Sequence, residues 1–138
     1  MKKYTIRSTV VDIVFCVGDS ILLVKRGKDP CKGMWALPGG YLDEDDVYTA
    51  ASRELKEETG LSIPPYGFNF LGTFSKFNRD ARHNVSIALK VKIDSTEQPK
   101  VKGGDDAVDA CWFKMKMLPP LAFDHADIIF TFLRQEFK

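Results

Sequence analysis

The stretch from residue 39 to residue 61 constrains the fold more than any other part of the chain. It begins with two glycines, continues through an acidic loop, and then carries a helical pattern that stops at Gly60. A glycine at this point can adopt the left-handed conformation that closes a helix. At roughly 100° per residue, Val47, Ala50 and Ala51 fall on one face. This pattern predicts a helix of about three and a half turns that packs against a core.

The same face of this helix becomes acidic toward its C-terminal end. Glu54, Glu57 and Glu58 continue the alanine stripe, although like charges three and four residues apart destabilise a helix by roughly 0.2–0.5 kcal/mol per pair. A hard divalent cation would satisfy all three carboxylates, and oxygen ligands favour Mg²⁺ or Mn²⁺ over zinc. The alternative is a solvated acidic face that pairs with Arg53 and Lys56. Because the apolar stripe leads directly into the glutamates, we favour the metal site.

Apolar runs before this stretch predict strands. Residues 9–17 are rich in β-branched side chains and apolar on both faces, which is typical of a central strand. A tight turn follows and leads into a second strand at residues 21–25, so the two should pair as a hairpin. Residues 34–37 predict a short strand in which Trp35 belongs to the core, with stacking of a nucleobase on Trp35 as the alternative.

The second half of the chain contributes further strands. Residues 68–77 are aromatic and β-prone, residues 85–93 alternate between apolar and polar side chains, and residues 110–113 form a short apolar run. The alternation predicts a half-exposed strand, with its apolar side facing the core and with Ser86 and Ala88 on the solvent side.

A last helix is predicted from residue 124 onward, with Asp124 as its N-cap. Apolar residues at helical spacing should form its buried face, and these are Ala126, Ile129, Phe130, Leu133 and Phe137. Together the elements predict one domain over residues 1–138 that is long enough to bury a core. Its fold class is α/β, an α/β/α sandwich in which a mixed sheet is flanked by two helices.

The balance of charge and the cysteines limit the partners and the compartment. Twenty lysines and arginines oppose nineteen aspartates and glutamates, for a net charge of +1, so a nucleic-acid polymer is not expected. No run reaches the roughly eighteen apolar residues of a membrane span, and no signal peptide is recognisable. The three cysteines are odd in number and far apart, which favours free thiols, with a reactive Cys31 as the alternative. We therefore expect a cytoplasmic protein.

The residues around the acidic helix resemble the signature of the Nudix hydrolases. The order is a glycine, five residues, an acid, seven residues and then Arg-Glu-Leu-Lys-Glu-Glu-Thr-Gly-Leu. The fixed positions of the signature match Gly39, Arg53, Glu54, Leu55, Glu57, Glu58, Gly60 and Leu61. Asp45 stands where the family usually has glutamate. The resemblance implies a Nudix-like sandwich and hydrolysis of a nucleoside diphosphate linked to another group. It also implies Mg²⁺ held by the glutamates, with Arg53 orienting a carboxylate.

Motifs in the second half are similar to the ADP-ribose pyrophosphatase branch of that family. They lie at residues 74–75, 79–82, 105–107, 112–113 and 118–125. This resemblance implies that a homodimer cleaves ADP-ribose, a small nucleotide, to AMP and ribose 5-phosphate. Substrate binding would then involve Arg26, Arg79, Arg82, Gly39 and Gly40. The alternative for the arginines is that they are solvated loop charges.

Several acids are candidates for removing the proton from the attacking water. One of the three helix glutamates is a candidate, and so are Asp105 and Asp106, whose alternative is a plain acidic loop. His83 and His125 are expected to be structural or exposed rather than catalytic.

Two other functions compete with this hypothesis. A nucleoside triphosphate pyrophosphatase would release pyrophosphate, and a binding module would hold ADP-ribose-like ligands without cleaving them. The intact set of three glutamates argues against the binding module, because a protein that only binds an anionic ligand has little use for clustered anions.

Overall fold

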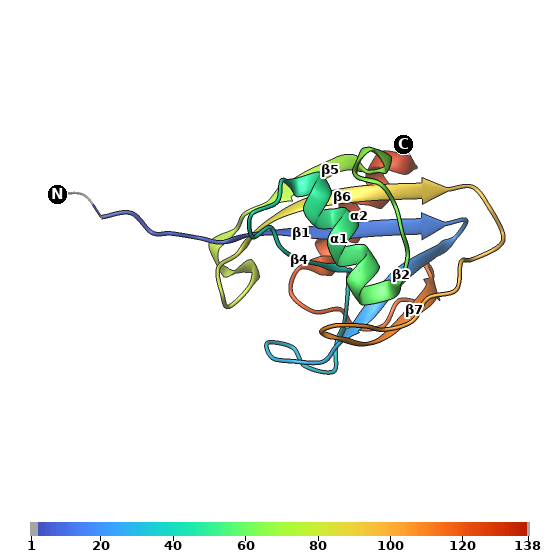
Figure 1. Cartoon of the computed structure of the whole chain (residues 1–138), viewed down its shortest axis with the longest axis horizontal. Coiled ribbons are helices and arrows are strands. Elements are labelled where there is room, and N and C mark those ends of the chain that lie inside the picture. Colours follow the sequence, from blue (N-terminus) through green and yellow to red (C-terminus); the bar gives the residue numbers. More distant parts are fainter. Residues whose placement is uncertain (1–2, 138) are drawn as a thin grey trace.

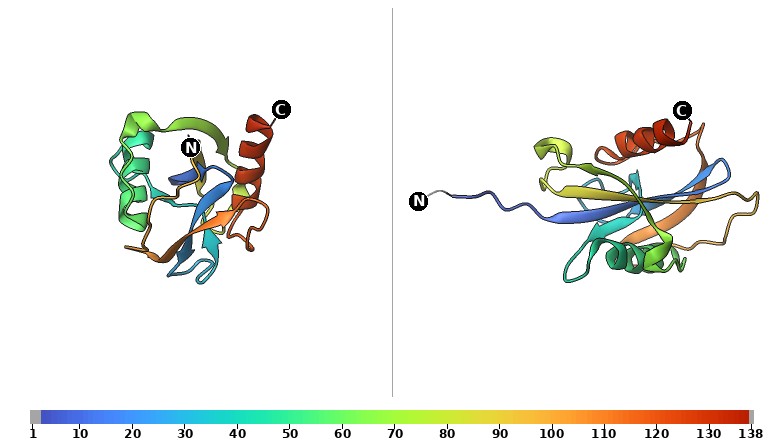
Figure 2. Two further views of the ribbon diagram at one scale, coloured as in Figure 1. Left: turned by 90° about the vertical axis from the view of Figure 1, so that its right-hand side faces the viewer. Right: turned by 90° about the horizontal axis from the view of Figure 1, so that it is seen from above.

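The computed structural model describes residues 3–137 and places two helices on opposite sides of one mixed sheet (Figures 1 and 2). The strands are β1 (Thr9–Val17), β2 (Ser20–Arg26), β3 (Trp35–Ala36), β4 (Gly39–Tyr41), β5 (Asn69–Phe74), β6 (Val85–Ile93) and β7 (Ala107–Lys114). The helices are α1 (Val47–Thr59) and α2 (His125–Glu136), with short 3-10 turns η1 (Pro65–Gly67) and η2 (Phe77–Arg79). The predicted α/β/α sandwich is confirmed.

β1 lies at the centre of the sheet, as its apolar composition predicts. The main strand order is β3-β2-β1-β6-β5, and β1 runs parallel to β6 from Thr9 opposite Val85 to Val17 opposite Ile93. All residues of β1 after the first are buried. The predicted hairpin between β1 and β2 is also confirmed, with Val17 opposite Ser20 beside the turn.

β1 and β2 pair only beside their turn and then diverge. Their paired positions are Cys16 with Ile21 and Val17 with Ser20. Farther along, β4 pairs with β1, whereas β3 and β7 pair with β2. The two halves of the sheet therefore separate toward one end, and the pocket described below is lined by residues of β1, β2 and β4 at that end.

Helix α1 ends at Gly60, as predicted, and begins at a residue whose side chain caps it. The Asp46 carboxylate accepts a hydrogen bond from the Thr49 N–H at 2.9 Å, which caps the first turn. Gly60 adopts φ +81° and donates its N–H to the Lys56 carbonyl at 2.9 Å. Ala50 and Ala51 are fully buried in the core between α1 and the sheet. The helix predicted from the alanine stripe is confirmed.

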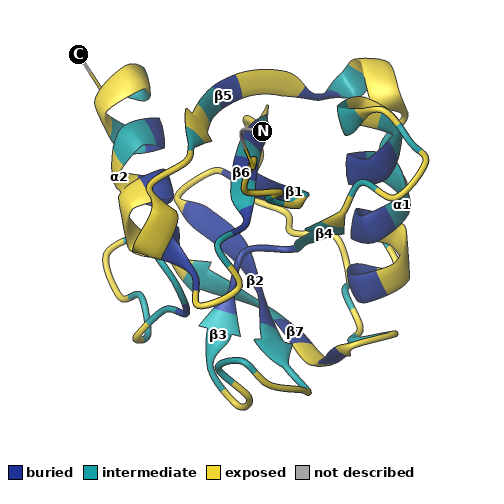
Figure 3. Cartoon of the chain, turned by 90° about the vertical axis from the view of Figure 1, so that its left-hand side faces the viewer, coloured by how far each residue is buried: buried dark blue, intermediate teal, exposed yellow. Residues whose placement is uncertain are grey.

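Helix α2 buries a different face from the predicted one. His125, Ile128, Ile129 and Phe132 are buried, whereas Ala126, Phe130 and Phe137 are exposed, so the predicted stripe is wrong at three of its five positions. Figure 3 shows the buried inner face and the exposed outer face of each helix. The physical reason is a tertiary contact at the start of α2. The Leu37 N–H donates to Nδ1 of His125 at 2.9 Å, which turns His125 and the residues one turn later toward the sheet.

Asp124 occupies the N-cap position of α2, but its side chain does not cap the helix. Its carboxylate instead pairs with Arg79 at 2.6 Å. An ion pair between buried or partly buried groups outweighs a cap, because a guanidinium left alone in the interior is costly.

The alternating strand β6 is covered on both faces over its first half. Ser86 and Ala88, predicted to face solvent, are fully buried, whereas Ile93 at the other end is 37% exposed. Ala88 packs in the core between the sheet and α2, together with Ile128, Ile129 and Phe132. The prediction failed because alternation cannot reveal a helix that packs on the polar side of a strand.

Strand limits also differ from the predicted ones. The aromatic run predicted as a strand over residues 68–77 is β5 over Asn69–Phe74 followed by η2. Trp35 packs edge-to-face on Phe113 with ring centroids 4.8 Å apart, which confirms its place in the core. Within residues 3–137, no helix combines the length and apolar composition needed to cross a membrane.

Candidate functional site

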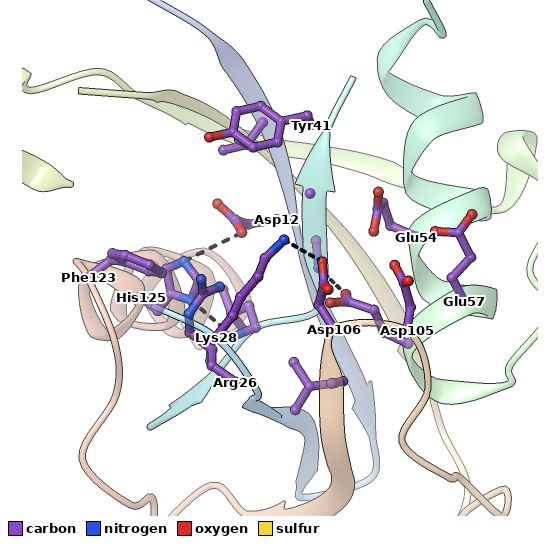
Figure 4. A pocket seen from close by; sticks show the side chains of 18 of the residues that line it. Asp12, Arg26, Lys28, Tyr41, Glu54, Glu57, Asp105, Asp106, Phe123 and His125 are labelled. Carbon is purple, nitrogen blue, oxygen red and sulfur yellow. Dashed lines mark hydrogen bonds and ion pairs between the residues drawn. The ribbon is translucent and has the colours of Figure 1, made fainter. Parts of the chain in front are cut away.

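A cavity of about 300 Å³ opens at the end of the sheet where β1 and β2 diverge. Figure 4 shows Glu54, Glu57 and Asp105 on one side of it and Phe123 and His125 on the other. The walls come from both halves of the sequence, because α1 supplies the acidic side and the loop before α2 supplies the opposite side. The pocket therefore exists only in the folded protein.

The three glutamates of α1 all line this pocket but differ in burial. Glu54 and Glu58 retain 9% and 8% of their exposed surface, whereas Glu57 is exposed at the rim. Oε1 of Glu58 accepts the backbone N–H of Gly39 at 2.8 Å. The alternative of a fully solvated acidic face is therefore wrong for Glu54 and Glu58.

The electrostatics of the acidic side are unfavourable for anions. Burial raises the pKa of Glu58 to about 8, and the carboxylates of Glu54 and Asp12 add to the effect. Burial also raises the pKa of Glu54 to about 7, against the opposing influence of the Arg53 guanidinium. Carboxylates in this state gain from a nearby cation, because it restores the ionised form.

The chemistry of this acidic side fits a hard divalent cation, which binds carboxylate oxygens. The side chains do not yet converge on one point: among residues 3–137, no three acidic, histidine or cysteine side chains are arranged to hold a metal ion. The fit thus rests on donor type, burial and charge rather than on a preformed coordination geometry.

Arg53 links the acidic side to two loops through its guanidinium group. Nε donates to Asp45 at 2.8 Å, Nη1 to Glu54 at 2.8 Å and Nη2 to the backbone oxygen of Tyr41 at 3.1 Å. Asp45, the residue that departs from the family pattern, therefore fixes the orientation of Arg53. Arg53 in turn fixes the carboxylate of Glu54, as the sequence predicts.

Gly39 and Gly40 allow β4 to approach its neighbours closely. A Cβ atom at Gly39 would overlap the backbone carbonyl oxygen of Val11, and one at Gly40 would lie 2.5–2.7 Å from the carboxyl group of Glu54. Real Cβ atoms do not make contacts this short. Gly39 thus lets β4 approach the backbone of β1, and Gly40 leaves space for the Glu54 carboxylate.

The loop before β7 brings another acid to the cluster. Asp105, at φ +51°, points toward Glu54 and Glu57 in Figure 4 and helps to raise the pKa of Glu54 and Glu58. Asp106 instead pairs with Lys28 at 2.8 Å, and both side chains are more than half exposed. The structure thus separates the two candidates, and Asp105 is the one beside the glutamates.

Arg79 is buried, so its alternative reading as a solvated turn charge is wrong. Its side chain is 2% exposed, and it binds Asp124 through Nε at 2.9 Å and Nη2 at 2.6 Å. Nη1 donates to the Asn84 carbonyl at 3.2 Å. Arg79 lines the pocket, but each nitrogen of its guanidinium already has a protein acceptor.

Arg82 and Arg26 differ from each other in their charge partners. Arg82 binds the buried carboxylate of Asp80 through Nε at 3.1 Å and Nη2 at 2.9 Å. Although burial opposes ionisation, these hydrogen bonds hold the pKa of Asp80 below its usual range. Arg26 donates from Nε to the Pro30 carbonyl at 2.7 Å. Within residues 3–137, no carboxylate lies at ion-pair distance from Arg26.

Sequence reasoning missed a buried polar group opposite the glutamates. Asp12 is 5% exposed, accepts the Ser86 hydroxyl at 2.5 Å, and lies 3.4 Å from Nε2 of His125. Nη2 of Arg79 is 3.8 Å away. A carboxylate within a strand that is otherwise apolar on both faces was the available signal. His125 is structural, as predicted, since its Nδ1 accepts the Leu37 N–H.

Two aromatic residues of the pocket were also missed as site residues. Tyr41 is the last residue of β4, and Phe123, at φ +54°, precedes α2. Both line the pocket and both lie close to guanidinium groups. No local sequence pattern could pair positions so far apart in the chain.

A mixed sheet between two helices, with a carboxylate-bearing helix facing a pocket at the open end of the sheet, defines the class as a Nudix-type sandwich. The NUDIX domain model matches residues 6–132, and the chain belongs to the Nudix family. This finding confirms the family predicted from the signature. Nudix hydrolases generally use divalent metal ions.

The chain is similar in sequence to characterised relatives and in fold to solved structures. An ADP-ribose pyrophosphatase of Methanocaldococcus jannaschii is 41% identical over 139 residues, covering 97% of this chain and 79% of the relative. A bifunctional NMN adenylyltransferase/ADP-ribose pyrophosphatase of Francisella tularensis, in complex with AMP and a Mn ion, is 29% identical with a TM-score of 0.81. That match covers 98% of this chain and 43% of the Francisella chain.

The NUDIX domain of NrtR from Shewanella oneidensis, complexed with ADP-ribose, gives a TM-score of 0.83 at 27% identity. The match covers 96% of this chain and 90% of that domain. Together with the preceding matches, it confirms the predicted sandwich fold.

Proposed function

We propose that this protein is a Mg²⁺-dependent Nudix hydrolase that cleaves ADP-ribose to AMP and ribose 5-phosphate. The observation that carries the proposal is the cluster of Glu54, Glu57 and Glu58 on α1, two of them buried, facing a pocket with arginines on its other wall. The 41% identity to an ADP-ribose pyrophosphatase supports the substrate. The ligands of the two solved structures, AMP with Mn in one and ADP-ribose in the other, support it further.

The glutamates of α1 would hold the metal ion. Glu54, Glu57 and Glu58 supply oxygen donors, which suit Mg²⁺ and also Mn²⁺. The bound cation would neutralise charge on the pyrophosphate and lower the pKa of the attacking water. The raised pKa values of Glu54 and Glu58 support this assignment, because a divalent cation compensates the charge that burial penalises.

The surrounding residues would position these carboxylates and the substrate. Arg53 holds the Glu54 carboxylate, and the Gly39 N–H holds that of Glu58, so both act as positioning groups. Gly40 leaves room for Glu54 beside β4. Asp105 lies beside the glutamates and is our candidate for accepting the proton of the attacking water.

The three pocket arginines would have different tasks. Arg26 has no carboxylate partner among the described residues, which makes its guanidinium our candidate for the pyrophosphate oxygens. Two nitrogens of Arg79 already donate hydrogen bonds to Asp124, so Arg79 would form part of the pocket wall rather than contact a phosphate directly. Arg82, held by Asp80, would contact the substrate through the flat face of its guanidinium.

The organisation of the protein is part of the same proposal. Residues 1–138 would form one Nudix domain, which the family match over residues 6–132 supports. The protein would act in the cytoplasm as a homodimer on a small nucleotide, without a nucleic-acid polymer or a membrane as partner. Cys16, Cys31 and Cys111 are free thiols, which agrees with a reducing compartment.

Product analysis tests the proposed reaction. The protein is incubated with Mg²⁺ and separately with ADP-ribose, NADH, diadenosine polyphosphates and nucleoside triphosphates, and the products are separated by chromatography. We expect ADP-ribose to give AMP and ribose 5-phosphate faster than any other compound is consumed. Release of pyrophosphate from triphosphates instead would point to a nucleoside triphosphate pyrophosphatase. Metal-dependent binding of ADP-ribose without turnover would point to a binding module.

A further inference from the structure

We propose that Tyr41, Arg82 and Phe123 form a stacking wall that binds the nucleobase of the substrate on the side of the pocket opposite the acidic cluster. The inference rests on the proposed function, because it assigns one half of the nucleotide to a part of the same pocket. Its starting point is the close approach of flat groups. The Arg82 guanidinium carbon lies 5.7 Å from the Tyr41 ring centroid and 5.2 Å from that of Phe123.

Arg82 is held as a flat surface rather than as a free charge. Nε and Nη2 both bind the carboxylate of Asp80, at 3.1 and 2.9 Å, and the backbone N–H of Arg82 binds the same carboxylate at 2.8 Å. Asp80 is 3% exposed and also accepts the Asn84 amide at 3.3 Å. The Asp80 carboxylate compensates the charge of Arg82, whose guanidinium stays ionised because, although burial opposes ionisation, these hydrogen bonds raise its pKa. A planar, weakly hydrated guanidinium remains, which is a surface suited to stacking on a base.

Hydrogen bonds hold Tyr41 at its backbone oxygen and at its hydroxyl group. Its backbone oxygen accepts Nη2 of Arg53 at 3.1 Å, and its hydroxyl group accepts the Asn84 amide at 3.2 Å. The residue is 39% exposed, so part of its ring faces the open pocket. Successive residues of a strand point to opposite faces. β4 therefore presents Tyr41 to one half of the pocket, while Gly40 opens the other half to Glu54.

Phe123 reaches the wall through an uncommon backbone conformation. Its φ of +54° is rarely adopted by an aromatic residue, and such conformations are retained where the surroundings impose them. Its ring lies 5.2 Å from the Arg82 guanidinium and 5.0 Å from that of Arg26. Phe123 thus lies between Arg82, whose charge Asp80 compensates, and Arg26, which has no carboxylate partner among the described residues.

The chemistry of the wall selects one part of a nucleoside diphosphate sugar. Aromatic rings and guanidinium planes stack on bases, whereas a ribose offers no π face. The pyrophosphate is the anionic part, and the remaining charge of Arg26 and a cation at the glutamates suit it. The ligand is therefore oriented with its base on the stacking wall and its pyrophosphate toward the acidic cluster. A pyrophosphate that lacks a base would lose this orientation.

Binding of the two halves of the substrate tests the wall without requiring turnover. Isothermal titration calorimetry with Mg²⁺ measures the affinity of the wild-type protein for AMP and for ribose 5-phosphate, which both carry one phosphate but differ in the base. We expect AMP to bind more tightly. Tyr41→Leu removes an aromatic ring and Arg82→Lys removes a planar guanidinium group, so each should weaken the affinity for AMP about tenfold. Neither substitution should change the affinity for ribose 5-phosphate.

Matched variants separate the loss of stacking from the loss of the hydroxyl group and from the effect of a tyrosine substitution outside the pocket. Tyr41→Phe keeps the ring and loses the hydroxyl group, so it should bind AMP nearly as well as the wild type. Tyr66→Leu makes the same change as Tyr41→Leu at a tyrosine that is 90% exposed and outside the pocket, and it should change neither affinity. If Arg82→Lys unfolds because Asp80 loses its partner, Tyr41→Leu decides the question alone.

The outcomes are distinct. Three results would each overturn the stacking wall. The first is an equal loss of affinity for AMP and for ribose 5-phosphate in the variants. The others are an unchanged AMP affinity in Tyr41→Leu and a wild-type protein that does not bind AMP more tightly than ribose 5-phosphate. If ADP-ribose is not hydrolysed but AMP binding still depends on the Tyr41 ring, the proposed reaction fails and the stacking wall stands. If ADP-ribose is hydrolysed and the affinity for AMP does not depend on the Tyr41 ring, the proposed reaction stands and the stacking wall fails.

Discussion

The backbone N–H of Gly39 donates a hydrogen bond to Oε1 of Glu58 at 2.8 Å, and this bond joins strand β4 to the last turn of α1. It satisfies a buried carboxylate whose pKa burial raises to about 8. Glu54, one turn earlier, is held from the other side by Arg53 at 2.8 Å. Two carboxylates of one helix are thus oriented by backbone and side-chain donors before any ligand binds.

Gly40→Ala should impair catalysis more than stability. The added methyl group would lie 2.5–2.7 Å from the Glu54 carboxyl group, so the flexible side chain must move away. A displacement of about 1 Å at a catalytic site can lower kcat about a hundredfold. Steady-state kinetics with ADP-ribose measure the loss. Gly72→Ala is the matched control, because its Cβ would make an ordinary 3.4 Å contact with Phe74. Wild-type activity in Gly40→Ala would show that the position of Glu54 does not matter for the reaction.

Glu57→Gln should lower kcat by at least about a hundredfold and leave the fold intact. The substitution removes a charge and keeps the size, and the side chain is 42% exposed, so folding does not depend on it. Kinetics with ADP-ribose and thermal melting are the two measurements. Glu97→Gln, in an exposed loop away from the pocket, is the control. Near-normal turnover in Glu57→Gln would place the metal site elsewhere.

Arg53→Lys should raise the Mg²⁺ concentration needed for half-maximal activity about tenfold. A lysine keeps the charge but cannot bond Asp45, Glu54 and the Tyr41 carbonyl together, because it lacks the planar fork. Activity is measured against Mg²⁺ concentration in both proteins. Asp45→Asn, which weakens one of the three bonds, should shift the midpoint by less. An unchanged metal requirement in Arg53→Lys would contradict a positioning role.

Protonation of His125 should oppose the stability that the protein gains in acid from Glu54 and Glu58, whose raised pKa values of about 7 and about 8 make the folded chain the better proton acceptor at these groups. Burial lowers the pKa of this histidine from its ordinary value of 6.5, so the unfolded chain binds a proton more readily than the folded one. No stability is lost from His125 above that value, and its contribution to stability falls as the pH drops below it. Thermal melting from about pH 8 to about pH 5 measures the effect. His125→Asn keeps an acceptor for the Leu37 N–H and should gain more stability than the wild type as the pH falls below 6.5, whereas His83→Asn should follow the wild-type profile. Equal slopes in His125→Asn and the wild type would contradict the prediction.

Local sequence signals located the elements whose formation depends on neighbours in the chain. The alanine stripe and Gly60 predicted α1, and the apolar run of β1 predicted the central strand. The acidic side of the pocket was predictable for the same reason. Glu54, Glu57 and Glu58 lie within one and a half turns of one helix, so spacing alone places them together.

Contacts between distant segments decided the opposite side of the pocket. Asp12 bonds Ser86 across 74 positions, and Arg79 bonds Asp124 across 45. The residues around Asp124 predict an N-cap, because no neighbour in the sequence indicates that its carboxylate pairs with the buried Arg79. The buried face of α2 was misjudged for the same reason, since the bond from Leu37 to His125 spans 88 positions.

The sequence by itself determined a Nudix helix, its three carboxylates and the central strand, because helical and strand periodicities are set by residues a few positions apart. The tertiary structure decided which arginines keep a free charge, which acid lies beside the glutamates, and where Tyr41 and Phe123 meet. These properties depend on burial and on ion pairing between segments far apart in the chain. Such interactions exist only once the sheet has formed and the two helices have packed against it.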